Sequence, residues 1–498
     1  MSFLLYNIFG TPLHTMNQPD SLDSLKQQFL NPPQELGPFP FWFLNDDLDK
    51  AEMTRQILDF HSKGISGIVL HSRIGLPSGL EYLGDRFMDF IRHATLEAGR
   101  CGMKVILYDE GMYPSGSAHG LVVKKNPDFA SSGIFMREYL PQDISSLLQG
   151  RKTEGNRIVI PLLPEEHLVA AVAANKTTEN AIQTDSAKAL SVSGKAIDIS
   201  PIKKSYRSVF CFIQAKTRGT IRGIHEGEDD GQPDAPASAD LLNPEAVRAF
   251  IEITHERYFN ALGDYFGNTI IAMFTDEPDI MGRNAAPGMF PWTQGFLAEW
   301  KKAGNDEEFL PALFLDAGAE TDKIRRRYHL AINSRLASSY YAPLSKWCEE
   351  HGIALTGHPK ESDDIGLLRH FQIPAQDTVW RWVSPTAESG ISGRHSTLAK
   401  CGADAARLSG RKRNANECFG CCGPKAAPWG FSADDMKWYL DWLFVRGVNM
   451  IVPHAFYYSI RGDLRRNERP PDVGPNNIWW PEYRRFSDYI KRMSLLLT

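Results

Sequence analysis

The sequence predicts an α/β fold, namely a (β/α)8 barrel of the TIM type with a small β-rich insertion after the third strand. Two observations lead to this class. Short apolar stretches alternate along the chain with amphipathic stretches of helical period, and several apolar stretches end abruptly in acidic or basic side chains. Parallel strands that are covered on both faces have this composition, and their carboxyl ends carry the polar residues. A length of 498 residues suits one large barrel with insertions, or two to four smaller domains.

The first three strands and the two helices between them follow one another without interruption. The predicted elements are, in order, strand 39–45, helix 50–63, strand 67–73, helix 87–102 and strand 103–108. Capping acids precede the first helix, and Gly64 ends it. Strands and helices that alternate in this way imply a parallel sheet with right-handed crossovers.

Residues 133–218 have a different character. Short runs rich in Val, Ile and Ala, such as residues 157–161 and 208–213, are separated by polar turns. This pattern predicts a small β-rich insertion and not another strand–helix unit of the barrel. The predicted divisions are an N-terminal extension at 1–34, the first part of the barrel at 35–132, the insertion at 133–218 and the second part of the barrel at 219–498.

Five further strands complete the predicted barrel. They are expected at residues 269–274, 353–358, 377–380, 411–417 and 448–453, with helices at 245–262, 322–351 and 434–446. The strands at 377–380 and 411–417 are the least apolar of the five. Eight strands separated by helices fit a barrel better than a doubly wound sheet.

Composition excludes several classes of protein. Lys and Arg total 55 and Asp and Glu total 60, which gives a net charge of −5 without a long run of one sign. This balance argues against a nucleic-acid-binding protein and is compatible with a neutral ligand. No apolar run is long enough to span a membrane, and the first residues lack the basic region and cleavage site of a signal peptide. We therefore expect a cytoplasmic protein without a membrane partner.

The seven cysteines, an odd number, agree with a reducing compartment. Cys418, Cys421 and Cys422 form a tight cluster that resembles half of a zinc site. Zinc sites of this spacing need a second pair of Cys or His ligands, and the sequence offers none at similar spacing. We interpret these cysteines as small residues of a crowded loop.

The strand at 269–274 runs into Asp276, Glu277 and Pro278. Pro278 lacks a backbone donor and stops the strand, so the two acids lie at its carboxyl end, where α/β enzymes do their chemistry. Taken alone, the pair is about as typical of a helix cap followed by a solvated acid. The pattern recurs at Asp109, Glu110 and Glu417, and this recurrence favours a catalytic interpretation.

If the barrel closes, its rim gathers carboxylates, imidazoles and aromatic rings, without a phosphate-binding glycine loop. Such a mixture suits a sugar, because acids and histidines bind hydroxyls while rings pack on the apolar face of the sugar. The expected catalytic pair is Glu277 and Glu417, because cleavage of a glycosidic bond needs two carboxyl groups on opposite sides of it. The predicted substrate-binding residues are Asn45, His71, Arg73, Tyr108, Asp109, Glu110, His358, Glu361, His454 and Tyr457. Trp42 is expected in the core, and Asp276 is expected to support a neighbouring residue.

Six motifs, in order, resemble those of glycoside hydrolase family 106, the α-L-rhamnosidase family. They are Pro-Phe-Trp-Phe-Leu-Asn-Asp at 40–46, His-Ser-Arg at 71–73, Tyr-Asp-Glu at 108–110 with Pro-Ser-Gly at 114–116, Thr-Asp-Glu-Pro at 275–278, Thr-Gly-His at 356–358 and Val-Pro-His-Ala-Phe-Tyr-Tyr at 452–458. The likeness extends from about residue 38 to the C-terminus and is poorest over the insertion at 133–218.

The resemblance implies an inverting, exo-acting hydrolase with a (β/α)8 catalytic domain. Glu277 would be the general acid, and Glu417 would be the base that activates water. The resemblance also implies a Ca²⁺ ion that contacts sugar hydroxyls, with Glu361 or other rim acids as its ligands. Two departures are visible: the cysteine-rich surroundings of Glu417, and a chain that ends at Thr498 where relatives continue into β-sandwich domains.

These departures leave two alternatives open. One is a barrel homologue that binds carbohydrate without cleaving it. The other is a glycosidase of different sugar specificity on the same fold. The sugar, the metal ligands and the oligomeric state are not defined by the sequence.

Overall fold

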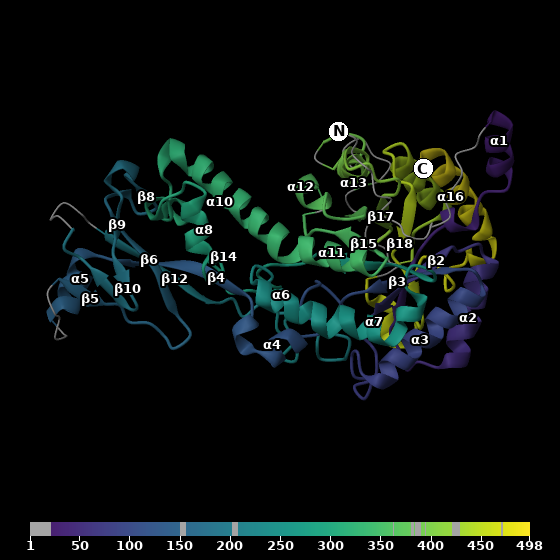
Figure 1. Ribbon diagram of the computed structural model, residues 1–498, viewed down its shortest axis with the longest axis horizontal. Helices are drawn as coiled ribbons and strands as arrows, with labels where there is room; N and C mark the ends of the chain where they lie inside the picture. Colours follow the sequence, from purple (N-terminus) through teal and green to yellow (C-terminus); the bar gives the residue numbers. More distant parts are fainter. Residues whose placement is uncertain are drawn as a thin grey trace, which may run out of the picture.

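A computed structural model shows an elongated chain with two lobes, joined along one long helix (Figure 1). One lobe surrounds a nine-stranded parallel sheet and the other a five-stranded antiparallel sheet. The described residues are 21–149, 156–201, 208–361, 363–379, 383, 390–393, 395–420, 429–469 and 472–498. Residues 1–20 of the predicted N-terminal extension, together with Cys421 and Cys422, lie outside these ranges.

The parallel sheet has the strand order β18-β17-β16-β15-β13-β3-β2-β1-β19. Its strands are β1 (Phe41–Leu44), β2 (Gly67–Ser72), β3 (Lys104–Tyr108), β13 (Ile270–Asp276), β15 (Ala354–His358), β16 (Ile373–Thr378), β17 (Ala415–Cys418), β18 (Met450–Pro453) and β19 (Phe456–Tyr457). Two residues separate β18 from β19, yet the two strands stand at opposite ends of the order. The sheet is therefore nearly closed, and the prediction of a barrel-like parallel α/β fold is confirmed.

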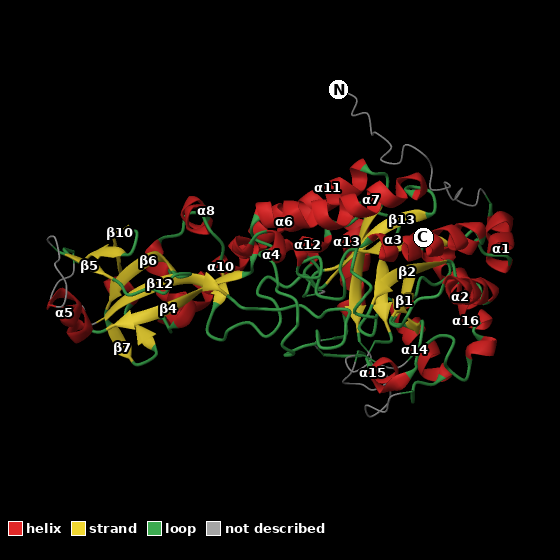
Figure 2. Cartoon of the chain, turned by 90° about the horizontal axis from the view of Figure 1, so that it is seen from below, coloured by secondary structure: helices red, strands yellow, loops and turns green. Residues whose placement is uncertain are grey.

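Helices cover the outer face of this sheet (Figure 2). They include α2 (Lys50–Ser62), α3 (Asp85–Arg100), α7 (Glu256–Leu262), α11 (Ala342–Glu350), α13 (Leu398–Leu408), α14 (Ala433–Phe444) and α16 (Arg484–Leu497). The α2 helix begins where expected, because the Asp49 side chain accepts a hydrogen bond from the Glu52 N–H at 2.9 Å. Among the described residues, every helix is too short or too polar to cross a membrane.

Side chains alternate between two cores. Phe41 and Phe43 point into the barrel with Phe274, whereas Trp42 and Leu44 of the same strand pack under the outer helices. Trp42 is fully buried, and its indole N–H donates to the Gln56 side chain at 2.9 Å. The prediction that Trp42 is a core residue is thus confirmed.

Two strands differ from the sequence prediction. The strand expected at 377–380 is β16 (Ile373–Thr378), which begins four residues earlier. Its proline and polar residues interrupt the apolar pattern by which a buried strand is recognised in sequence. Trp380 lies outside the described residues. The strand expected at 411–417 is observed as the shorter β17 (Ala415–Cys418). The expected first residues include Arg411 and Arg413, which lie before the buried stretch of the strand. In the observed register Asp377 lies opposite Glu417, so two carboxyl groups are side by side.

The helix predicted at 322–351 is continuous but contains a π-helical turn. It comprises α10 (Thr321–Leu336), the π-turn Ala337–Tyr341 and α11. This helix runs from the small lobe to the barrel-like sheet (Figure 1). Inside the π-turn, the Tyr340 hydroxyl lies 2.7 Å from Thr275 Oγ1, next to the polar end of β13.

The small lobe contains the sheet β14-β4-β12-β6-β9. Its strands are β4 (Ser132–Tyr139), β6 (His167–Ala174), β9 (Lys188–Leu190), β12 (Ser208–Lys216) and β14 (Phe290–Pro291). A smaller sheet pairs β10 (Val192–Ser193), β11 (Ala196–Asp198) and β5 (Arg157–Val159). The predicted β-rich character of residues 133–218 agrees with these strands, whereas the domain boundaries stay a prediction. Residues 150–155 and 202–207 of that segment lie outside the described ranges.

Candidate active site

Three strands of the barrel-like sheet deliver ionisable side chains to one buried cluster. Asp276 ends β13, His358 ends β15 and Glu417 lies near the end of β17. The His358 imidazole lies between the carboxylates, with its Nε2 atom 3.1 Å from Glu417 Oε2 and 3.4 Å from Asp276 Oδ1. Because Asp276 is paired with His358 across β13 and β15, the register of the sheet itself brings these groups together.

His358 carries a positive charge at neutral pH. Burial alone would lower the pKa of this fully buried imidazole, but the hydrogen bond to Glu417 and the charge of Asp276 outweigh burial and raise it to about 10. The imidazolium therefore donates to Glu417 and fixes the direction of that carboxylate.

Asp276 is held from two further sides. The Tyr108 hydroxyl donates to Asp276 Oδ2 at 2.6 Å, and the Asp276 backbone N–H donates to Ser115 Oγ at 2.8 Å. The Ser115 N–H returns a bond to the Asp276 carbonyl at 2.8 Å. These contacts fix Asp276 between Tyr108 and His358, where its carboxylate positions both side chains.

Glu277 occupies a strained position next to this cluster. Its φ of 43° lies in the left-handed region, which non-glycine residues rarely adopt and which is common at functional sites. Burial raises the pKa of Glu277 to about 7, and the charges of Asp276 and Glu417 act in the same direction. A carboxyl group of this pKa holds a proton in a large fraction of molecules at neutral pH, which suits a general acid.

Glu417 is buried and differs from Glu277 in its partners. Burial raises its pKa above the ordinary value and the charge of Asp276 adds to this effect, while the His358 hydrogen bond opposes both. The imidazolium thus favours the ionised form of Glu417, which is the form that a general base needs.

Asp377 belongs to the cluster and was not predicted as a site residue. It is buried beside Glu417, and its Oδ1 atom has no hydrogen-bond partner among the described groups. Burial raises the pKa of Asp377 well above its usual range, and the charges of Glu417 and Glu277 add to this. Burial and the neighbouring charges therefore favour the neutral form of Asp377, and its position near the end of β16 would have been recognisable had that strand been placed correctly.

Two neutral histidines and several rings line the same end of the barrel. His71 stacks on Tyr108 with ring centroids 3.7 Å apart, and Phe43 contacts both His71 and His454 at 5.0 Å. Burial lowers the pKa of His454 to about 3 and that of His71 well below its ordinary value, and the nearby charge of Arg73 adds to both effects. Neutral imidazoles both donate and accept hydrogen bonds, as sugar hydroxyls require.

Arg73 is part of an ion-pair network that the sequence did not reveal. Its guanidinium binds the Glu468 carboxylate at 2.7 and 3.1 Å and lies 4.2 Å from the centre of the Phe43 ring. Arg222 reaches the same carboxylate at 2.9 Å. Glu468 lies 395 positions from Arg73 in the chain, so no local pattern connects them.

Three other predicted substrate-binding residues use their polar atoms in loop contacts. Asn45 exchanges two hydrogen bonds with the Ser459 backbone, at 2.9 and 3.0 Å. The Glu110 carboxylate accepts the N–H groups of residues 111, 117, 118 and 119. The Tyr457 hydroxyl donates to the carbonyls of residues 468 and 469. Substrate contact by these three stays a prediction.

Asp109 and Glu361 complete the predicted set. Asp109 accepts a 2.5 Å hydrogen bond from the Ser115 hydroxyl, and burial raises its pKa well above the usual range. Glu361 is exposed on the loop after β15. Its role as a substrate or metal ligand stays a prediction.

Asp276, His358 and Glu417 also place potential metal-ligating atoms within 4.8 Å of one another. Ca²⁺ prefers six to eight oxygen ligands, whereas this group offers two carboxylates around an imidazole that is protonated at neutral pH. These three side chains alone do not fit a calcium ion, and the predicted Ca²⁺ stays a prediction.

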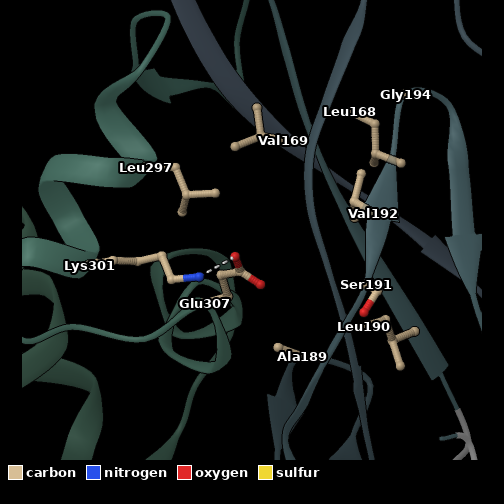
Figure 3. Close-up of a pocket in the computed structure, with 10 residues that line it drawn as sticks. All are labelled: Leu168, Val169, Ala189, Leu190, Ser191, Val192, Gly194, Leu297, Lys301 and Glu307. Atoms are coloured by element: carbon tan, nitrogen blue, oxygen red, sulfur yellow. Dashed lines mark hydrogen bonds and ion pairs between the residues drawn. The ribbon is translucent and has the colours of Figure 1, made fainter.

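A cavity of about 610 Å³ lies in the small lobe, away from this cluster. Aliphatic side chains from β6, β9, β10 and α8 (Phe296–Lys302) line it, together with the ion pair of Lys301 and Glu307 (Figure 3). Its lining residues include neither an aromatic ring nor a pair of carboxyl groups, in contrast to the cluster at the barrel end.

Known proteins resemble this chain in sequence and in fold. A solved rhamnosidase from Novosphingobium sp. PP1Y superposes with a TM-score of 0.65 at 17% identity, covering 95% of this chain and 60% of that one. A relative from Formosa agariphila, named "Putative beta-glucuronidase", is 20% identical over 530 residues, covering 97% of this chain and 42% of its own length. The chain therefore spans less than two thirds of either protein.

The family model described as alpha-L-rhamnosidase matches residues 232–498, which is more than half of the chain. The matched region contains Glu277, His358, Asp377 and Glu417. The family predicted from the six motifs is thereby confirmed: the chain belongs to glycoside hydrolase family 106, the alpha-L-rhamnosidase family.

Proposed function

We propose that the protein is an inverting, exo-acting α-L-rhamnosidase that removes terminal rhamnose from glycans or glycosides. The observation that carries this proposal is the contrast between two glutamates at one end of the barrel-like sheet. Glu277 has a pKa raised to about 7, whereas Glu417 receives a hydrogen bond from a protonated histidine. Two carboxyl groups in unlike environments are what glycosidic cleavage requires.

In the proposed reaction, protonated Glu277 donates its proton to the glycosidic oxygen as the bond to the leaving group breaks. Ionised Glu417 takes a proton from a water molecule that attacks the anomeric carbon from the opposite face. His358 orients Glu417 and stabilises its charge until that proton arrives. The inverting outcome is what the family resemblance implies, and the charge of Glu417 acts on Glu277, which supports a shared site.

The walls of the site support a neutral, partly apolar sugar. Tyr108 and Phe43 supply rings, and neutral His71 and His454 supply hydrogen bonds. We further propose that β18 and β19 act as one interrupted strand, which makes the barrel a (β/α)8 barrel with residues 133–218 as an insertion.

A second candidate is a glycosidase for a sugar that carries a carboxylate. Four arginines surround the Tyr113 ring at 5.2 to 6.0 Å from its centre: Arg73, Arg222, Arg283 and Arg469. The positive charges of Arg283 and Arg73 act on Glu277 and Glu417 respectively, so this group lies close to the proposed acid and base. The relative named a glucuronidase agrees with this candidate, whereas the pairing of three of these arginines with Glu468, Asp229 and Asp230 weakens it.

One experiment separates these candidates. The full chain is incubated with nitrophenyl glycosides, including α-L-rhamnoside and β-D-glucuronide, and the anomer released first is read by NMR. Release of β-rhamnose supports the proposal, and release of α-rhamnose contradicts an inverting mechanism. Cleavage of the glucuronide alone favours the second candidate. Calorimetric binding of rhamnose without any product would favour a carbohydrate-binding protein.

A further inference from the structure

A second group of metal-ligating side chains lies in loops beside the barrel-like sheet. His119 comes from the loop after β3, and His225 and Glu228 come from the loop between β12 and α6 (Pro244–Phe250). All three are partly buried, and their potential ligand atoms lie within 4.8 Å of one another. His119 Nε2 is 2.8 Å from Glu228 Oε2, and the two imidazole rings meet edge to face with centroids 5.6 Å apart.

We propose that His119, His225 and Glu228 bind one divalent transition-metal ion of the Zn²⁺ class, at a structural site distinct from the acid cluster. Two imidazoles and one carboxylate are a ligand set typical of zinc, whereas Ca²⁺ and Mg²⁺ prefer oxygen ligands alone. Metal bonds of about 2.0–2.1 Å at tetrahedral angles separate ligand atoms by about 3.3 Å. The 2.8 Å pair therefore needs to open only slightly to admit the ion.

The outer contacts of these ligands are those that a metal site needs. His225 Nδ1 lies 3.2 Å from the Leu76 carbonyl oxygen. When Nδ1–H donates to that oxygen, the lone pair is on Nε2, and metal-ligating histidines commonly hold their other nitrogen in this way. The Glu228 carboxylate accepts a hydrogen bond from the backbone N–H of His225 at 2.8 Å.

The backbone on both sides is shaped around the three ligands. His119 and Ala118 have φ values of 54° and 50°, a conformation that persists in non-glycine residues only where the surroundings fix it. The buried Glu110 carboxylate fixes it here by accepting the N–H groups of both residues. On the other side, a Cβ atom at Gly223 would lie 2.3 Å from Glu228 Oε2, so the carboxylate packs directly against a glycine.

A bound ion would join two loops directly and a third through the hydrogen bond between His225 and the Leu76 carbonyl. Leu76 follows β2, His119 follows β3, and Glu228 lies in the loop that also carries Arg222. The loop after β3 contains Ser115, which holds the backbone of Asp276. We therefore expect the ion to stabilise the scaffold of the acid cluster without taking part in the reaction.

Titration of ZnCl₂ into tag-free, EDTA-treated full-length protein, followed by calorimetry, tests the site without reference to activity. One ion per chain should bind, and the melting temperature should rise by several degrees. His225→Ala and Glu228→Gln should each weaken binding by at least about tenfold. Gly223→Ala keeps all three ligands but displaces the carboxylate, so it should also weaken binding. His167→Ala, at an exposed histidine elsewhere, is the matched control.

Glu417→Gln separates this site from the acid cluster, because it should leave zinc binding unchanged. Co²⁺ gives a second readout, since an N- and O-ligated ion should produce visible absorption bands that His225→Ala removes. Circular dichroism in EDTA shows whether each variant is folded. Wild-type binding weaker than about 1 mM, or wild-type affinity in folded Glu228→Gln and His225→Ala together, would overturn the proposal.

Discussion

The charge on His358 is the feature of the site that a single measurement tests most directly. Its pKa is raised from 6.5 to about 10 by partners at 3.1 and 3.4 Å. That difference corresponds to roughly 5 kcal/mol of extra stabilisation of the imidazolium. Glu417→Gln removes one of the two negative charges and keeps a hydrogen-bond acceptor, so the pKa of His358 should fall by about 1 to 3 pH units.

The assay is nitrogen NMR of protein labelled with ¹⁵N-histidine, recorded from pH 5 to pH 10.5. The chain has 14 histidines, so the His358 signal is assigned by its absence from the His358→Gln spectrum. Asp279→Asn is the matched control, because Asp279 pairs with Lys360 at 2.7 Å and has no contact with His358 among the described interactions. A wild-type His358 that titrates near pH 6.5, or one that ignores Glu417→Gln, would refute this electrostatic account.

Four further predictions concern the proposed reaction. Glu277→Gln and Glu417→Gln should each lower kcat by about 10²–10⁴ or more with folding intact. The loss of kcat in Glu277→Gln should be smaller on a substrate with a highly activated leaving group. Wild-type turnover by either variant contradicts the assignment of that residue. Because the acid must be protonated, kcat/KM should fall as pH rises above about 7, the pKa of Glu277, and a profile flat to pH 9 would exclude Glu277 as the acid. Asp377→Asn replaces a neutral carboxyl with a neutral amide, so kcat should change by less than about tenfold, and a larger loss measured in steady state would show that Asp377 is ionised or contacts the substrate. If the Ca²⁺ ion that the family resemblance implies takes part in the reaction, exhaustive chelation should abolish turnover and added Ca²⁺ should restore it. Unchanged activity after chelation would contradict a role for calcium.

The sequence predicted the fold and the centre of the site for the same physical reason. Strands buried on both faces have apolar sequences, so a sudden acid or histidine at their ends is visible without coordinates. The prediction that Glu277, His358 and Glu417 are site residues rests on this contrast. Asp377 was missed, because β16 begins at Ile373 and contains a proline and a glutamine that break the apolar pattern.

Sequence could not show which strand-end residues use their polar atoms in bonds to loop backbone. Asn45 and Glu110 stand at strand ends like His358, but their oxygens are bonded to loop backbone. The difference depends on segments far away in the chain, such as Ser459, which lies 414 positions from Asn45. Glu468 was missed for the same reason, since its partners Arg73 and Arg222 belong to other loops.

The cluster at the end of the barrel cannot hold all its carboxyl groups ionised at once. Burial raises the pKa values of Asp377 and Asp109 well above their usual range and that of Glu277 to about 7, so it opposes a negative charge on all three. The positive charge of His358 offsets part of this cost through its contacts with Glu417 and Asp276. Because these groups interact through a buried medium, a proton leaving Glu277 changes the affinity of its neighbours for theirs. If the proposed activity holds, its pH profile should be assigned to the cluster as a whole, and each single substitution in the cluster should shift both the acidic and the basic limb of the profile.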